Sequence, residues 1–257
     1  NDLCTFCHTE EVRHIDDTGK NVALKIDRAA ELKHSMVVLS GGEPTIRPEL
    51  KAWARRSAAR GMDFGLVTNG RMLSYAPLVD ALMESRLGYV YLSLHGGSAQ
   101  VHNACVRSHA FEETFGGLKE LSGRGLNLTA NCVITKTNLP HLRELVDLVS
   151  PLEDVTLQFS MTEPKGGAFR LFNQVVPRVA DVAHAVTDAI AYGRSLNMGH
   201  RLGHGGIPLC LLPGLENLYG DLKTHHFATM TEVGEADFFP VDDLNKNQPA
   251  PCKNCSL

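Results

Sequence analysis

Two groups of cysteines are the residues whose types and spacing could do chemistry in this chain. Cys4 and Cys7 form a C-x-x-C pair at its start, and a second group near its end consists of Cys210, Cys252 and Cys255. Two thiolates three residues apart on a short loop can bind one metal centre. The same spacing also suits a zinc site or a redox pair, so the pair alone does not define its chemistry.

A cysteine immediately before Asn1 would complete the motif C-x-x-x-C-x-x-C, and we expect the third ligand of a metal cluster there. The clustering of cysteines at the two ends does not fit a disulfide scaffold. It favours metal or redox chemistry in a reducing compartment, so the expected location is the cytoplasm.

A glycine-rich turn follows the apolar run at residues 36–39. In Gly41-Gly42-Glu43-Pro44, the glycines let a ligand approach the backbone, and the Glu43 carboxylate can bind an ammonium group. Thr68-Asn69-Gly70 follows the next apolar run in the same way. Alone, each segment could be an ordinary strand-to-helix turn.

Short apolar runs alternate with amphipathic stretches, as in repeated βα units. Strands are predicted at residues 36–39, 62–67, 89–95, 126–134 and 155–161, and helices at 26–34, 48–61, 77–86, 111–122, 140–149 and 179–196. Parallel α/β sheets place their sites at the carboxyl ends of the strands, where both turns fall. The expected fold is therefore α/β, with the two turns at one edge of a parallel sheet.

Three of these strands carry polar residues on one face, although strands of a parallel sheet are usually apolar on both. Ser93, Asn131 and Gln158 share that face and are expected to converge on a bound cofactor. His95 continues the pattern and is the candidate catalytic residue, as a substrate contact or proton carrier; a packed core residue is the alternative. His102, Cys105 and Arg107 are expected in the loop that follows, and Cys132 in the core.

Taken in order, these motifs resemble the radical SAM superfamily. Cys4-Thr5-Phe6-Cys7 is similar to the end of the cluster motif, Gly41-Gly42-Glu43-Pro44-Thr45 to the segment that holds the amino group of S-adenosylmethionine, and Leu92-Ser93-Leu94-His95-Gly96 to a cofactor-binding strand. The resemblance implies a partial (β/α)6 TIM-like barrel whose first strand precedes Asn1. The cofactor contacts that it implies are Gly41, Gly42, Glu43, Pro44, Thr68, Asn69, Ser93 and Asn131, to which the polar face adds Gln158.

The resemblance also implies a reaction. Three thiolates on a [4Fe–4S] cluster leave one iron open to chelate S-adenosylmethionine. One electron, from a donor such as flavodoxin or ferredoxin, would cleave the sulfonium and give methionine and a 5′-deoxyadenosyl radical. That radical would abstract hydrogen from a peptide or small-metabolite substrate. The alternatives are a radical SAM methyltransferase and a zinc-binding module without catalysis.

The end of the chain is expected to form a separate unit, with domains at residues 1–198 and 199–257. Cys210, Cys252 and Cys255 resemble the ligands of a SPASM or twitch extension, which holds a second [4Fe–4S] cluster. With three ligands, either one iron is open or a fourth cysteine lies beyond Leu257. A zinc site that includes His204 or His225 is the alternative.

Composition excludes several other classes of protein. The chain has 257 residues, of which 43% are hydrophobic and 21% charged, so it is globular rather than disordered. Its net charge of −4 disfavours nucleic acid as the main partner. No apolar run approaches the roughly eighteen residues that span a bilayer, so no membrane association is expected.

Overall fold

A six-stranded sheet forms the centre of the computed structural model, which describes residues 2–8, 10, 17–220, 228–230, 238–240, 250 and 252. All neighbouring strands of this sheet are parallel and follow one another in chain order. The strands are β1 (Met36–Leu39), β2 (Asp63–Thr68), β3 (Leu87–Ser93), β4 (Asn127–Ile134), β5 (Val155–Met161) and β6 (Leu202–Gly205). Because β1 and β6 lie at opposite edges, the sheet is open, as expected for a partial TIM-like barrel.

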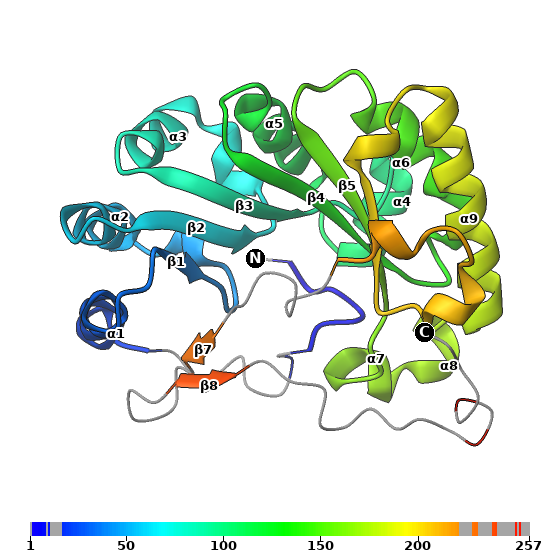
Figure 1. Ribbon diagram of the computed structural model, residues 1–257, viewed down its shortest axis with the longest axis horizontal. Coiled ribbons are helices and arrows are strands. Elements are labelled where there is room, and N and C mark those ends of the chain that lie inside the picture. Colours follow the sequence, from blue (N-terminus) through cyan, green and yellow to red (C-terminus); the bar gives the residue numbers. More distant parts are fainter. Residues whose placement is uncertain are drawn as a thin grey trace.

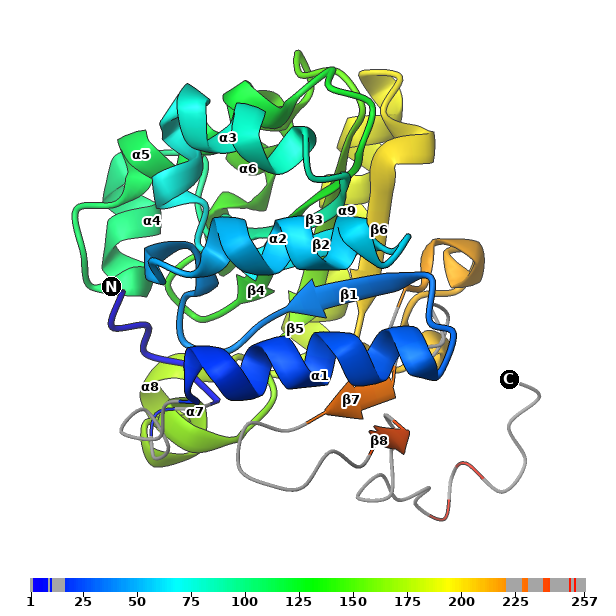
Figure 2. The same cartoon turned by 90° about the vertical axis from the view of Figure 1, so that its left-hand side faces the viewer.

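Helices cover the outer face of this sheet (Figure 1). They are α1 (Gly19–Glu31), α2 (Leu50–Ala59), α3 (Ala76–Met83), α4 (Ala99–Val106), α5 (Phe111–Leu121), α6 (Leu142–Val149) and α9 (Val179–Ser195). The short helices α7 (Gly166–Arg170) and α8 (Phe172–Val175) lie apart from this layer, beside the N-terminal loop (Figure 1). Figure 2 shows α1 and α2 alongside β1, and the N-terminal loop at the end toward which β1 points. Short 3₁₀ helices include η2 (Pro44–Ile46), η3 (Arg71–Ser74), η4 (Leu139–His141), η5 (Gly199–Arg201), η6 (Leu209–Leu211) and η7 (Glu216–Leu218).

Strand alternation builds the core between sheet and helices. Val90, Leu92 and Leu94 are fully buried against the helix layer, whereas Tyr91 and Ser93 on the other face are half-buried. The periodic apolar positions of α6, which include Leu142, are buried in the same layer. The polar pattern in the sequence therefore marks the inner face of the sheet, as predicted.

The five predicted strands and their helices are confirmed, with ends that differ by a few residues. Several elements were not predicted, among them α4, the short helices α7 and α8, and the strands after α9. Residues 99–106 form helix α4 instead of a loop, because the polar residues in this stretch hid its helical pattern. Strand β6 lies within the range expected for the C-terminal extension, yet it pairs with β5 in the main sheet. The division at residue 198 thus does not coincide with a break in the sheet, and it remains a prediction.

The C-terminal part also contains β7 (Ala228–Met230) and β8 (Phe238–Pro240), which form a separate antiparallel pair. Across the described residues, the structure contains no helix long and apolar enough to cross a membrane.

Candidate active site

Cys4 and Cys7 lie together in one turn, in which the Cys7 N–H donates to the Cys4 carbonyl oxygen (3.3 Å). Both side chains are half-buried. Between them, Phe6 is buried and meets the ring of His95 edge-on, with 4.8 Å between ring centroids. The aromatic residue of the motif therefore anchors the loop that carries the two thiols, which we call the cysteine loop (residues 2–8).

The cysteine loop rests on the end of α4. The Leu3 N–H donates to the carbonyl oxygen of Val106 (2.9 Å), and the Thr5 N–H donates to that of Cys105 (3.3 Å). The last carbonyls of a helix have no partner within it. The loop satisfies two of them and is thereby fixed to α4.

Helix α7 holds the other side of this loop. The Gly167 N–H donates to the Cys7 carbonyl oxygen (3.0 Å). A Cβ on Gly166 would overlap that same oxygen, and a Cβ on Gly167 would lie 2.8 Å from the carbonyl oxygen of Thr5. Only glycine permits this approach. The sequence shows this glycine pair, but its role emerges only from the fold.

Glu43 connects the ends of β1 and β2. Its Oε1 accepts from the Thr45 N–H (2.9 Å), the Thr45 hydroxyl (2.6 Å) and the Thr68 hydroxyl (2.7 Å), and its Oε2 accepts from the Asn69 N–H (2.7 Å). The carboxylate is buried. The two turns predicted from sequence therefore form one unit, and Glu43 is first a structural link between them.

Glycines give this unit, which we call the Glu43 turn (residues 41–45 and 68–70), its shape. Gly41 has a φ of 135° and Gly70 a φ of 76°, both in the region that favours glycine. A Cβ on Gly70 would overlap the side chain of Leu92, and one on Gly117 of α5 would overlap the Gly70 carbonyl oxygen. Helix α5 and strand β3 thus pack directly against the turn.

Ser93, Asn131 and Gln158 lie in one row across β3, β4 and β5, because their positions pair in register. Asn131 Oδ1 accepts from the Ser160 hydroxyl (2.7 Å). Gln158 Nε2 donates to the carbonyl oxygen of Gly220 (3.2 Å), so this amide is engaged within the protein. The structure brings the row together as predicted, and cofactor contacts by its members remain proposals.

His95 does not continue this row. It is buried behind Phe6, where its ring Nδ1 accepts from the Val133 N–H (3.2 Å), and its backbone N–H donates to Nδ1 of His102 (3.1 Å). Burial lowers the pKa of His95 to about 3, with a contribution from the nearby His102. The structure therefore favours the packed core residue over the substrate contact or proton carrier.

His102, Cys105 and Arg107 were expected in a loop, and the structure corrects this. His102 is buried in α4, and burial lowers its pKa to about 4, helped by the charge of Arg71. The Cys105 thiol is buried too, and Arg107 ends the helix with a φ of 52°. Cys132 lies in the core, as predicted.

The C-terminal cysteines are only partly described. Cys210 lies exposed in η6, Cys252 is half-buried, and Cys255 lies outside the described residues, as does His225. His204 is buried in β6, where its Nε2 lies 2.9 Å from the Leu215 carbonyl oxygen. Within the part of the chain that the structure describes, no three or more His, Cys, Asp or Glu side chains come together to hold a metal ion.

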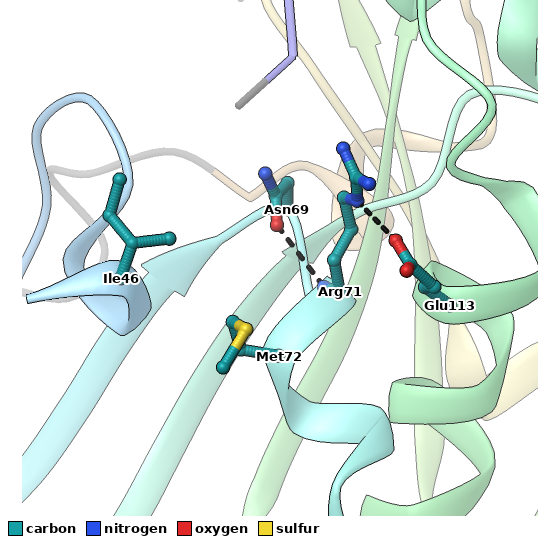
Figure 3. A pocket seen from close by; sticks show the side chains of 5 residues that line it. All are labelled: Ile46, Asn69, Arg71, Met72 and Glu113. Carbon is teal, nitrogen blue, oxygen red and sulfur yellow. Dashed lines mark hydrogen bonds and ion pairs between the residues drawn. The ribbon is translucent and has the colours of Figure 1, made fainter.

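Arg71 is a residue at this site that the sequence did not single out. It lines a pocket beside the Glu43 turn, together with Ile46, Asn69, Met72 and Glu113 (Figure 3). Ile46 and Met72 give the pocket an apolar side, and Arg71 pairs with Glu113 on the polar side. No motif marks Arg71, because an arginine after a turn is common on protein surfaces.

The chemistry of this site fits an iron–sulfur cluster and S-adenosylmethionine. Cys4 and Cys7 present two thiols from one anchored turn, and thiolates are the usual ligands of such clusters. The inner face beside them carries hydroxyl and amide groups, including those of Ser93 and Asn131, that could bind a polar cofactor. Burial raises the pKa of Tyr89 on this face to about 12, so its hydroxyl stays protonated.

Curated relatives match about two thirds of this chain. An AdoMet-dependent heme synthase of Methanosarcina barkeri is 28% identical over 159 residues, which are 62% of this chain and 42% of that protein. A PqqA peptide cyclase of Ruegeria pomeroyi is 30% identical over 188 residues, which are 71% of this chain and 50% of that protein. The chain thus spans about half the length of these relatives.

Solved structures share the fold. SuiB of Streptococcus suis, solved with its precursor peptide SuiA, matches with a TM-score of 0.63 and 18% identity, over 80% of this chain and 46% of that one. The Escherichia coli coproporphyrinogen III oxidase HemN matches with a TM-score of 0.52 and 14% identity, over 76% and 50%. A family model described as the radical SAM superfamily matches residues 1–149, more than half of the sequence. The chain belongs to the radical SAM superfamily.

Proposed function

We propose that this chain forms the catalytic core of a radical S-adenosylmethionine enzyme that abstracts hydrogen from a peptide. The observation that carries the proposal is the contact between the cysteine loop and the Glu43 turn at the carboxyl ends of the strands. Arg71 bridges them, since it follows the turn and donates to Asp2 of the loop (3.1 Å). A cluster on the loop would therefore face a cofactor held by the turn.

In this proposal, Cys4 and Cys7 hold two corners of a [4Fe–4S] cluster, and the third ligand is the cysteine expected immediately before Asn1. A cluster bound there would supply the one-electron reduction, with the electron taken from a flavodoxin or ferredoxin, that cleaves S-adenosylmethionine into methionine and a 5′-deoxyadenosyl radical. The Glu43 turn orients the amino group of the cofactor, and Ser93 and Asn131 bind its polar groups.

A peptide is the proposed substrate class. The relatives named as PqqA peptide cyclases and the neighbour solved with a precursor peptide both support it. The heme synthase relatives support the alternative of a small metabolite. Incubation with a library of peptides and detection of 5′-deoxyadenosine above the level without peptide distinguishes these two classes.

A second [4Fe–4S] cluster is a further part of the proposal. Cys210, Cys252 and Cys255 would hold it, with one open iron or a fourth cysteine beyond Leu257. Cys210 is exposed at the end of the barrel sheet, where a following unit could bind a cluster. If the same cysteines bound zinc instead, the chain would contain only the irons of the catalytic cluster.

Anaerobic reconstitution of the full-length protein tests the function. We expect absorbance at about 400 nm and about eight irons per chain for two clusters, or about four for one. Cys4→Ala and Cys7→Ala should each remove the catalytic cluster, whereas Cys132→Ala, in the core, should retain it. Reduced protein should form 5′-deoxyadenosine; S-adenosylhomocysteine would indicate a methyltransferase instead. Colourless protein that binds only zinc would exclude the enzyme.

A further inference from the structure

Arg71 is the residue at which three segments of the chain meet. Its backbone N–H donates to Asn69 Oδ1 (3.1 Å), and its Nη1 donates to Asp2 Oδ1 (3.1 Å) and to the Ser108 hydroxyl (3.2 Å). Its Nε donates to Glu113 Oε2 (2.5 Å). Figure 3 shows this side chain at the start of η3, directed toward Glu113 near the start of α5. Arg71 therefore connects the Glu43 turn, through its backbone N–H, with the cysteine loop, through its guanidinium.

The Asp2 end of this connection is the buried one. The Asp2 side chain is only 6% exposed. A carboxylate so far from water requires compensation by cations or hydrogen-bond donors. Asp2 is separated from Cys4 by a single residue, Leu3, whose N–H is fixed to the Val106 carbonyl oxygen. The ion pair of Asp2 with Arg71 therefore holds the cysteine loop two residues from Cys4, in addition to the backbone bonds to α4.

The Asn69 end is equally constrained. The Asn69 N–H donates to Glu43 Oε2 (2.7 Å), and its carbonyl oxygen accepts from the Thr114 hydroxyl (3.0 Å). Asn69 also accepts the backbone N–H of Arg71, so the start of η3 cannot move without the turn. A continuous series of bonds leads from Glu43 through Asn69 and Arg71 to Asp2.

We propose that Arg71 is a positioning residue, which sets the separation between the cysteine loop and the Glu43 turn. It acts through Asp2 and Asn69 and does not itself touch a proposed ligand of the cluster. The inference rests on the proposed function, because this separation matters for catalysis only if the loop holds the cluster and the turn holds S-adenosylmethionine. In this view, the ion pair between Arg71 and Asp2 fixes the distance between the cluster on the loop and S-adenosylmethionine on the turn.

Glu113 supplies a matched control. Its side chain is 52% exposed, so its ion pair with Arg71 is a surface pair. The variant Glu113→Gln removes the charge of this pair and leaves Asp2 and its hydrogen bond intact. Arg71→Met removes both ion pairs and the bond to Ser108, and Asp2→Asn removes only the charge on the loop side.

Amide hydrogen exchange of the cluster-free, full-length protein tests the positioning directly. In Arg71→Met and in Asp2→Asn, the amides of Leu3 and Thr5 should exchange about tenfold faster than in the unaltered protein. In Glu113→Gln the rate should change by less than about threefold. If both amides keep their protection in Arg71→Met and in Asp2→Asn, the proposal is wrong. Should Arg71→Met not fold, Asp2→Asn alone decides the question.

The reconstituted enzyme gives a second readout. In Arg71→Met, the dissociation constant of S-adenosylmethionine should rise about tenfold, and the change in the electron paramagnetic resonance spectrum on cofactor addition should be weaker. Arg71→Lys keeps the charge and should restore part of both. Equal spectra for Arg71→Met and the unaltered enzyme would overturn the inference. If the unaltered protein formed no cluster, the proposed function would fail, while the exchange experiment would still measure the positioning.

Discussion

The Glu43 turn and the cysteine loop form two sides of one site, yet they are held by different kinds of contact. In the turn, one carboxylate accepts four hydrogen bonds, which come from three residues: Thr45, Thr68 and Asn69. The loop has no such centre. Backbone hydrogen bonds attach it to α4 and α7, and neutral, buried histidines tie α4 to the sheet.

The difference lies in where the partners come from. Those of Glu43 lie on its own turn or at the end of the neighbouring strand, so the turn is complete once β1 and β2 pair. Those of the loop come from the far side of the barrel, including Val106 and Gly167. The loop therefore depends on the assembled barrel, and a change in either helix should disturb it while the turn persists.

Low pH should give the largest difference between the two sides, because the side with the cysteine loop depends on two buried histidines. Burial lowers the pKa values of His95 and His102 to about 3 and about 4, from 6.5 when unfolded. Below pH 6.5 the unfolded chain binds protons that the folded one excludes, so this stability is complete above about pH 6.5 and declines as the pH falls toward 4. Well below pH 6.5 each histidine contributes about 1.4 kcal/mol per pH unit, which amounts to about 3 kcal/mol for both between pH 6.5 and about pH 5.

Urea unfolding of the cluster-free protein, followed by fluorescence of the single tryptophan, Trp53, measures this loss. The variant His102→Asn can still accept the His95 N–H, and it should lose stability with pH about half as steeply. His200→Asn, at an exposed position, is the control. Equal pH dependence in His102→Asn and the unaltered protein would mean that folding does not lower the pKa of His102.

The Glu43 turn should instead be destabilised by a change to its carboxylate. Glu43→Gln keeps the shape but places an NH2 group among four donors, so at least one buried donor loses its partner. We expect unfolding at neutral pH to become easier by about 2–3 kcal/mol and binding of S-adenosylmethionine to be lost. The control Glu113→Gln, at an exposed ion pair, should cost less than about 1 kcal/mol. A loss no larger than that of the control would contradict the central role of Glu43.

The same difference explains what the sequence could predict. The Glu43 turn and the C-x-x-C pair are short motifs, and strand alternation placed Ser93 and Asn131 on the inner face correctly. These features depend on neighbours along the chain or on the period of a strand, and both can be read without the fold.

Features that depend on distant partners could not be predicted in this way. His95 continues the alternation of β3, but the strand ends at Ser93, and the next residues turn its ring into the core behind Phe6. Helix α4 gives no clear apolar stripe, because buried His102 occupies a position that a sequence pattern counts as polar. Arg71 and Gly166 gain their roles only from segments that tertiary packing brings beside them.

Packing of α7 against the loop should respond to one added methyl group. Gly166 and Gly61 both have positive φ values, of 50° and 78°, but a Cβ on Gly61 would meet nothing within 4 Å. Gly61→Ala therefore reports the backbone strain alone, about 1 kcal/mol. Gly166→Ala also displaces the Cys7 carbonyl, which should add about 1–2 kcal/mol and accelerate iron loss to a chelator. Iron loss at the same rate in both variants would show that the loop does not depend on α7.

Gln158 should give the smallest effect and decides how far the site extends along the sheet. Its Nε2 bond to the Gly220 carbonyl anchors the segment after β6, so Gln158→Leu should cost about 1 kcal/mol in unfolding free energy. Its effect on S-adenosylmethionine affinity should be less than that of Ser93→Ala, because the Ser93 hydroxyl lies half-buried on the inner face, whereas this amide is engaged. Isothermal titration of both variants compares them. If Gln158→Leu weakened binding more than Ser93→Ala, the amide would contact the cofactor, and the polar row would function as one surface across β3, β4 and β5.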